Sequence, residues 1–288
     1  MFSESEFEYI LSDYKVIHDG KMSKHKKISV SLMIILIVVV MVLYFFGLAN
    51  KDPLNILIPV YGGIILVLLG VYIMFSFGLG SSKAFYEFVV RKVIDKLIFN
   101  MELDLKYTSD KKTEFNHNIN GGIFSRHCRS NVRMHIKGTS SLGRQFDIFE
   151  LTLITGGGNS QQTHLNGIYI VLNNDARVIQ QIRSNGKPHL KGTNYYRIDT
   201  ESDFRIYLEE GISEREVSAE YNDLFSRVMS DTVKQKGYLS VIKNETHFAL
   251  HPFKLYKYRR LTLENLNIVY EKTKWLIELV DKLNIEEF

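Results

Sequence analysis

Two long uncharged stretches decide how this sequence folds: 28-ISVSLMIILIVVVMVLYFFGLA-49 and 54-LNILIPVYGGIILVLLGVYIMFSFGLG-80. A helix rises about 1.5 Å per residue and a bilayer core is about 30 Å thick, so roughly 20 apolar residues can cross it. The pattern predicts a two-helix transmembrane hairpin over 28–80, with spans at 28–49 and 54–78. A cleaved signal peptide is the alternative for the first stretch, but the acidic region before it and the second stretch after it argue against one.

Positively charged residues flank this pair of stretches. Lys21, Lys24, Lys26 and Lys27 precede the first stretch, and Lys83 follows the second. Lysine and arginine favour the cytoplasmic side of a membrane, so these lysines are expected at the membrane interface. We therefore expect a multi-pass plasma-membrane protein with both termini in the cytoplasm. Glycines in the second stretch indicate close helix packing, either inside the hairpin or in a homo-oligomer formed through the transmembrane helices.

The remaining sequence has the composition of a folded domain. The 288 residues carry a net charge of +4, one cysteine and four prolines. One cysteine excludes an internal disulfide framework, and the mild charge gives no reason to expect nucleic acid as a partner. The predicted layout is a cytoplasmic amphipathic head at 1–27, the hairpin at 28–80 and a cytoplasmic α+β domain at 83–288.

Two periodicities support the α+β prediction. Alternating apolar residues predict strands at 132–137, 144–154 and 167–173 and a β-hairpin over 238–250. Apolar residues at helical spacing predict helices at 3–18, 83–99, 213–236 and 262–284. Ser3 or Ser5 is expected to cap the first helix, and Gly237 to follow the end of the third. The fold class is thus a two-helix transmembrane hairpin followed by a mixed, largely antiparallel cytoplasmic domain.

Several segments after residue 83 resemble a bacterial family of two-span membrane proteins known only as a domain of unknown function, numbered 3137. The resemblance is carried by 136-IKGT-139, by 146-FDIFE-150 and by 165-LNGIYI-170. The amphipathic stretch 217–229 and the terminal hairpin and helix are similar as well. The resemblance covers about two-thirds of the chain and implies the two-span layout and the fold. No activity is assigned to the family, so it implies no mechanism.

Basic residues gather on or near two neighbouring predicted strands. The candidate ligand-binding residues are Arg126, Arg129, Arg133, Lys137 and Arg144. If residues 133 and 137 share a strand face, they belong to a positive strip that could bind a phosphate-bearing ligand, an anionic headgroup or nucleic acid. The alternative is the ordinary solvated face of a sheet.

No catalytic or metal-binding motif stands out in the sequence. There is no Walker-type loop and no H-E-x-x-H, and one cysteine cannot build a cysteine-rich metal site. We therefore assign no catalytic residue, cofactor or metal. The predicted function is a membrane-anchored cytoplasmic binding or sensor module, whose partners are the lipid bilayer and an anionic small molecule or a protein. Two alternatives stay open: a ligand-triggered membrane effector in bacterial defence that oligomerises through the hairpin, and an enzyme acting near the membrane.

Overall fold

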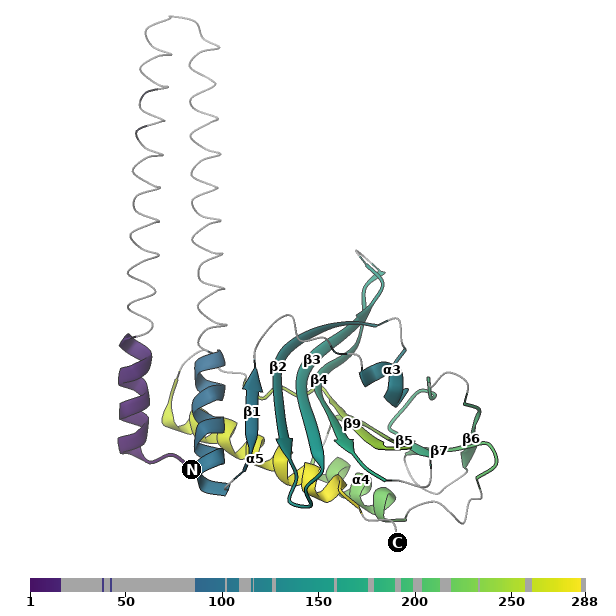
Figure 1. Ribbon diagram of the computed structural model, residues 1–288. Coiled ribbons are helices and arrows are strands. Elements are labelled where there is room, and N and C mark those ends of the chain that lie inside the picture. The colour runs from purple at the N-terminus through teal and green to yellow at the C-terminus, as the bar shows by residue number, and fades with distance from the viewer. Residues whose placement is uncertain are drawn as a thin grey trace, which may run out of the picture. The chain divides into compact units, whose positions relative to one another are not determined.

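The computed structural model describes most of the chain outside residues 17–85 (Figure 1). The described residues are 1–16, 38, 42, 86–101, 103–108, 115, 117–125, 128–157, 160–175, 179–189, 193–198, 204–212, 219–232, 234–256 and 261–285. The chain forms two compact units. The sheet unit comprises 93–258 and 267–288 with Met1, and the helical unit comprises 2–92 and 259–266.

No helix in the described part of the chain is long and apolar enough to cross a membrane. The helix α5 (Leu263–Leu283) has 21 residues, but lysines and glutamates recur along it, so it is amphipathic. This finding corrects the predicted two-helix transmembrane hairpin, and with it the integral-membrane class and the plasma-membrane location. The spans placed at 28–49 and 54–78, apart from Val38 and Val42, lie outside the described residues. So do Lys21, Lys24, Lys26, Lys27 and Lys83.

A nine-stranded antiparallel sheet forms the sheet unit, in the order β1-β2-β3-β4-β9-β8-β5-β7-β6. The first four strands follow one another as a meander. A late hairpin, β8–β9, then lies between β4 and β5 and joins the two ends of the sheet. The strands are β1 (Leu105–Thr108), β2 (Arg129–Thr139), β3 (Gln145–Thr155), β4 (Gln162–Asn173), β5 (Gln180–Arg183), β6 (Tyr195–Ile198), β7 (Arg205–Glu209), β8 (Lys236–Ile242) and β9 (Glu245–His251).

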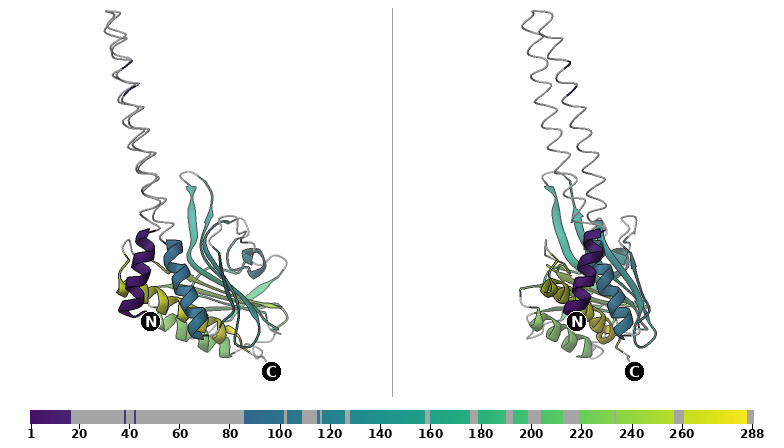
Figure 2. Two further views of the ribbon diagram at one scale, coloured as in Figure 1. Left: turned by 60° about the vertical axis from the view of Figure 1, so that its left-hand side comes forward. Right: turned by 90° about the vertical axis from the view of Figure 1, so that its left-hand side faces the viewer.

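Helices cover both faces of this sheet (Figure 2). α3 (His117–Gly121) lies against β4 and β9, where a Cβ added to Gly121 would come within 2.6 Å of both His247 and Tyr169. The other face carries α4 (Ala219–Asp231), whose Phe225 ring lies 6.4 Å from that of Phe248. His247 and Phe248 are consecutive in β9 and point to opposite faces. We name the two sides of the sheet the α3 face and the α4 face.

The sheet confirms much of the predicted secondary structure. The predicted strands correspond to β2, β3 and β4, the hairpin to β8 and β9, and the last helix to α5. Gly237 differs from its prediction: it lies in β8, and α4 ends earlier, at Asp231. A side chain there would overlap Met229 and Phe225 of α4, so glycine lets the helix pack closely on the strand.

The helical unit begins with the helix at 4–16. Ser3 caps this helix as predicted: Glu6 N–H donates to the Ser3 Oγ at 3.3 Å, and Ser3 N–H donates to the Glu6 carboxylate at 2.7 Å. This reciprocal pair is a capping box. Asp13 forms an ion pair of 2.9 Å with Lys92, which belongs to a second helix whose described part is 86–101.

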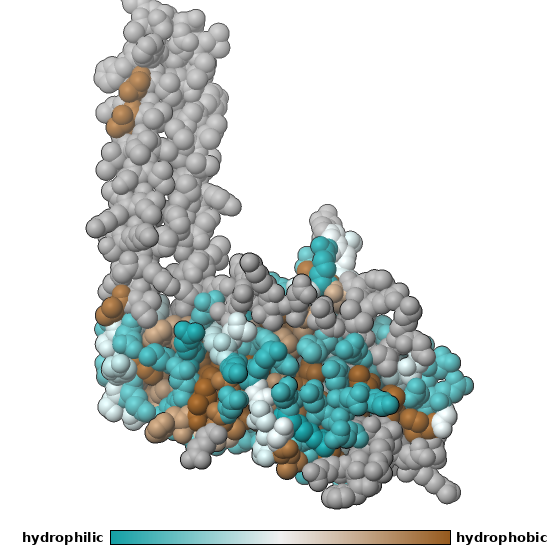
Figure 3. All heavy atoms as spheres, in the orientation of Figure 1, coloured by the Kyte–Doolittle hydropathy of each residue, from teal (hydrophilic) through white to brown (hydrophobic). Residues whose placement is uncertain are grey.

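Polar residues cover most of the visible described surface of the sheet unit, with apolar residues scattered between them (Figure 3). The apolar core on the α3 face is aromatic, and the Phe115 ring meets Tyr169 and Phe149 edge-on at 4.8 and 5.1 Å.

Candidate anion-binding site

The predicted basic strip is divided between the two faces of the sheet. Val132 pairs with Leu151 but Met134 pairs with Glu150, so Arg133 is an extra residue in a β-bulge. Arg133 reaches Glu150 and Asn166, whereas Lys137 reaches Asp147. Positions 147 and 150 of β3 lie on opposite faces, so Arg133 and Lys137 do not form one strip.

Each described member of the strip already has an oxygen partner. Arg129 donates to the Gly156 carbonyl at 2.6 Å, and Arg144 lies 3.4 Å from the Asp175 carboxylate. Lys137 lies 3.4 Å from Asp147. Arg126 is outside the described residues. Ligand binding by these residues stays a prediction, and their geometry offers no common anion site.

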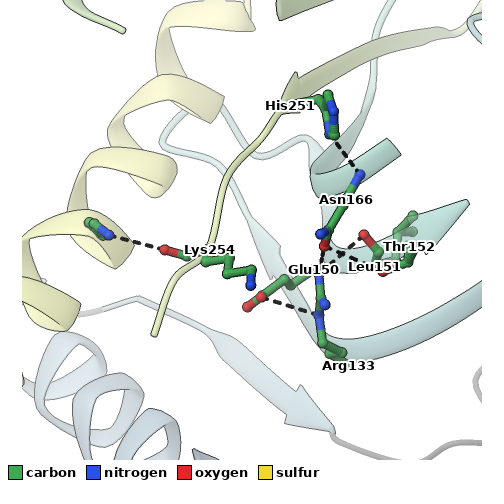
Figure 4. Close-up of polar contacts among 8 residues, drawn as sticks. Arg133, Glu150, Leu151, Thr152, Asn166, His251 and Lys254 are labelled. Carbon is green, nitrogen blue, oxygen red and sulfur yellow. Dashed lines mark hydrogen bonds and ion pairs between the residues drawn. The ribbon is translucent and has the colours of Figure 1, made fainter. Parts of the chain in front are cut away.

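Arg133 belongs to a partly buried polar network on the α4 face (Figure 4). Its Nε lies 3.3 Å from the Glu150 carboxylate, and its Nη2 donates to Asn166 Oδ1 at 2.6 Å. Asn166 N–H donates in turn to His251 Nδ1 at 2.9 Å. Burial lowers the pKa of His251, which agrees with a ring nitrogen that accepts a hydrogen bond. The network joins β2, β3, β4 and β9.

Two histidine–carboxylate pairs lie on the α3 face. His135 Nε2 is 2.5 Å from Asp147, and the His135 ring stacks on Phe149 at 4.2 Å. His247 Nε2 is 3.0 Å from Glu245, and its Nδ1 is 3.3 Å from the Tyr169 hydroxyl. The His247 side chain therefore lies between a carboxylate and a tyrosine hydroxyl, and it is fully buried.

α3 adds His117 to this group, which we name the histidine cluster: His117, His135, Asp147, Glu245 and His247. Burial lowers the pKa of His117, although Asp147 and Glu245 act in the opposite direction. Hydrogen bonds from His135 and His247 hold the pKa values of Asp147 and Glu245 below their usual range, against the effect of burial. Among the described residues, no group of three or more such side chains converges as metal ligands.

A pocket of about 640 Å³ opens beside β6 and β7, at the end of the sheet. Three of its lining residues are cations: Lys187, Arg197 and Arg205. The other lining residues that the structure describes are all uncharged: Pro188, Thr193, Asn194, Tyr195 and Tyr207. Burial raises the pKa of the Tyr195 hydroxyl, so this wall is also neutral at physiological pH. All the charged residues of the described lining are therefore positive.

Strand register adds a fourth cation, Arg183, directly opposite Arg205. Like charges at such a position repel each other. The Arg183 guanidinium is buried, and it donates to carbonyl oxygens of Ile123, Asn185 and Gln181 at 2.8 to 3.2 Å. Burial lowers its pKa to about 10, which still leaves it charged at pH 7. All these acceptors are uncharged, so its field extends toward the pocket.

The loop that carries Lys187 is held by Gly122, the residue that follows α3, and by Tyr207 of β7. His189 N–H donates to the Gly122 carbonyl at 2.8 Å, and the Tyr207 hydroxyl donates to the Gly186 carbonyl at 2.9 Å. Gly186 has a φ of 79°, a left-handed conformation that suits glycine in this turn. These contacts place Lys187 beside the two arginines of the pocket.

Comparisons with known proteins found no match from which the site could be assigned. No protein family, curated protein or solved structure matches the chain. The resemblance to the family numbered 3137 therefore stays an untested prediction.

One sign of this pocket is visible in the sequence. Tyr195 and Arg197 alternate in one segment, and Arg205 and Tyr207 alternate in the next. Period-two alternation puts both members of each pair on one strand face. The pairing of Arg197 with Tyr207 then brings the two pairs together, and that pairing is a property of the folded sheet.

Proposed function

We propose that this protein is a binding module for a small anionic ligand, which it holds in the pocket beside β6 and β7. The observation that supports the proposal most is the pair Arg183 and Arg205, which face each other across β5 and β7 beneath two further cations. No carboxylate of the described part of the chain lies within ion-pair distance of either arginine. A bound anion would relieve the repulsion between the two arginines.

Titration with inorganic phosphate, followed by calorimetry at low ionic strength, tests the proposal. Phosphate is expected to bind, and raising the salt concentration should weaken it by screening. Arg205→Gln should lower the affinity roughly tenfold or more, since a charge-assisted hydrogen bond contributes about 1.5–3 kcal/mol. Arg227→Gln removes an exposed cation from α4, on the opposite face, and should leave the affinity unchanged.

The connection between β6 and β7 provides a second test. Residues 199–203 lie outside the described part of the chain, and three of them, Asp199, Glu201 and Asp203, are acidic. Because they are close in sequence to Arg197 and Arg205, their charge should oppose an anion. A variant with Asn, Gln and Asn at these positions should bind phosphate more tightly. Weaker binding in that variant, or no effect of Arg205→Gln, would contradict the proposal.

A further inference from the structure

We infer that the ligand is a phosphorylated compound with an aromatic ring, of which a nucleoside monophosphate is the common biological form. This inference rests on the proposed anion site and adds the chemistry of the rest of the ligand. The pocket volume of about 640 Å³ is within the range of roughly 300–1,000 Å³ typical of sites for organic ligands. An inorganic anion needs only a small part of this space.

The register of β6 and β7 gives the pocket two chemically different ends. Arg197 lies directly opposite Tyr207, and Tyr195 lies directly opposite Glu209. Arg205 comes two residues before Tyr207, on the same face of β7. The arginines therefore gather toward one end of this short strand pair, and Tyr195 occupies the other.

The cationic end fits a phosphate group. Arg197 and Arg205 are exposed, and Lys187 is exposed on the loop beside them. Two guanidinium groups and an ammonium group offer several N–H donors to the oxygens of one phosphate.

The other end fits a flat ring. Tyr195 is half-buried, so its ring provides an apolar wall, and Pro188 lines the same pocket. Glu209 is close enough to Tyr195 to raise the pKa of its hydroxyl, after burial as the main cause. Glu209 does not line the pocket, but its negative charge near Tyr195 disfavours a second phosphate at this end. One phosphate at one end and one ring at the other satisfy both halves of the site.

Four probes separate the two parts of the ligand: inorganic phosphate, ribose 5-phosphate, phenyl phosphate and adenosine 5′-monophosphate. Calorimetry should give similar weak binding for the first two and an affinity at least fivefold higher for the two with a ring. This ratio is the lower limit expected for the stacking of one base on an aromatic side chain. Tyr195→Leu should remove most of the preference for a ring, and Tyr195→Phe should keep it. Circular dichroism establishes that each variant is folded.

The outcomes distinguish this inference from the proposed function. If phosphate binds and Arg205→Gln weakens it, but a ring adds nothing, the inference is overturned and the anion site stands. A ring preference that survives in a folded Tyr195→Leu variant also overturns the inference, because the ring then lies elsewhere. If none of the four probes binds, both are wrong.

Discussion

Arg133 and Lys137 lie on the same strand, yet their removal should have unequal effects. Arg133 neutralises Glu150, whose side chain is 3% exposed, whereas Lys137 is itself 60% exposed and pairs with Asp147. Loss of a cation beside a buried carboxylate costs more than loss of a surface ion pair. Arg133→Met should lower the free energy of unfolding by about 2–4 kcal/mol, and Lys137→Met by less than about 1 kcal/mol, measured in urea.

The double variant Arg133→Met/Glu150→Gln is the control for this explanation. It removes the buried negative charge together with its partner, so it should regain part of the stability lost in Arg133→Met. Equal costs for the two single variants would show that the Glu150 carboxylate does not depend on Arg133.

His117 should make the protein less stable as the pH falls below neutral. Burial holds the pKa of His117 below its usual value of 6.5, so the unfolded chain takes up a proton first. Stability is therefore lost as the pH falls from about 6.5 through the lower pKa of the folded state. His117→Gln should flatten the dependence between pH 7 and 5. It should not abolish it, since burial also lowers the pKa values of His189 and His251.

Measurements at pH 8 separate packing from protonation, since histidines are then neutral in the unfolded chain. Any loss in the free energy of unfolding that His117→Gln causes at pH 8 comes from packing. It should be subtracted from the loss measured at lower pH. Asp147 and Glu245 affect stability in a lower pH range. Because their pKa values are lowered in the folded state, they stabilise the fold above about pH 4.5, and this contribution is lost in stronger acid. If the free energy of unfolding of His117→Gln depends on pH between 7 and 5 as steeply as that of the natural chain, His117 is not a cause of the loss.

At the scale of elements, the packing of α4 on β8 depends on Gly237. A Cβ there would overlap Met229 and the Phe225 ring. Gly237→Ala should therefore lower the free energy of unfolding by about 1–3 kcal/mol, the usual cost of overpacking a core. Thermal unfolding followed by circular dichroism measures it. Gly157→Ala is the matched control, because among the described residues its Cβ would meet only Arg129, at 3.6 Å.

A second substitution tests the cause of that loss. Met229→Ala makes room for the added methyl group, so the cost of Gly237→Ala should be smaller in that background than in the natural chain. The same cost in both backgrounds would mean that Met229 is not the obstacle.

Elements with a strong local pattern could be predicted from the sequence. The alternation in β2 to β4, the hairpin β8–β9 and the apolar stripe of α5 all agree with the structure. The end of α4 could not be located, because Gly237 meets a tertiary requirement that resembles a helix-stop signal. The transmembrane prediction depended on apolar runs alone, and no described helix supports it.

The candidate site was harder to predict than the fold. Arg133 was placed in a basic strip because plain alternation was assumed, and the bulge between Val132 and Met134 breaks that alternation. The pocket cations come from segments that are separated in sequence and meet only through strand pairing, as Arg183 and Arg205 do. Sequence periodicity defines the face of a residue within one strand but does not define its neighbour on the next strand.

For the whole molecule, the strand order predicts where backbone amides are best protected. β4, β9 and β8 lie in the middle of the sheet, whereas β1 and β6 form its edges and have one neighbour each. Hydrogen exchange should be slowest in the middle strands and fastest in β1 and β6. Mass spectrometry of exchanged peptides measures the difference. Equal protection of β6 and β9 would indicate that another chain covers the edge.

The place of the β8–β9 hairpin in the sheet also affects how the chain folds during translation. β4 is complete once residue 173 has been added, but its neighbour β9 ends only at residue 251. At about 5–20 residues per second, a ribosome needs roughly 4–16 seconds to cover that interval. Throughout this time the nascent chain has an unpaired strand edge on β4. The sheet can close only after residue 251 has been added, and until then the open edge of β4 is exposed to pairing with other chains.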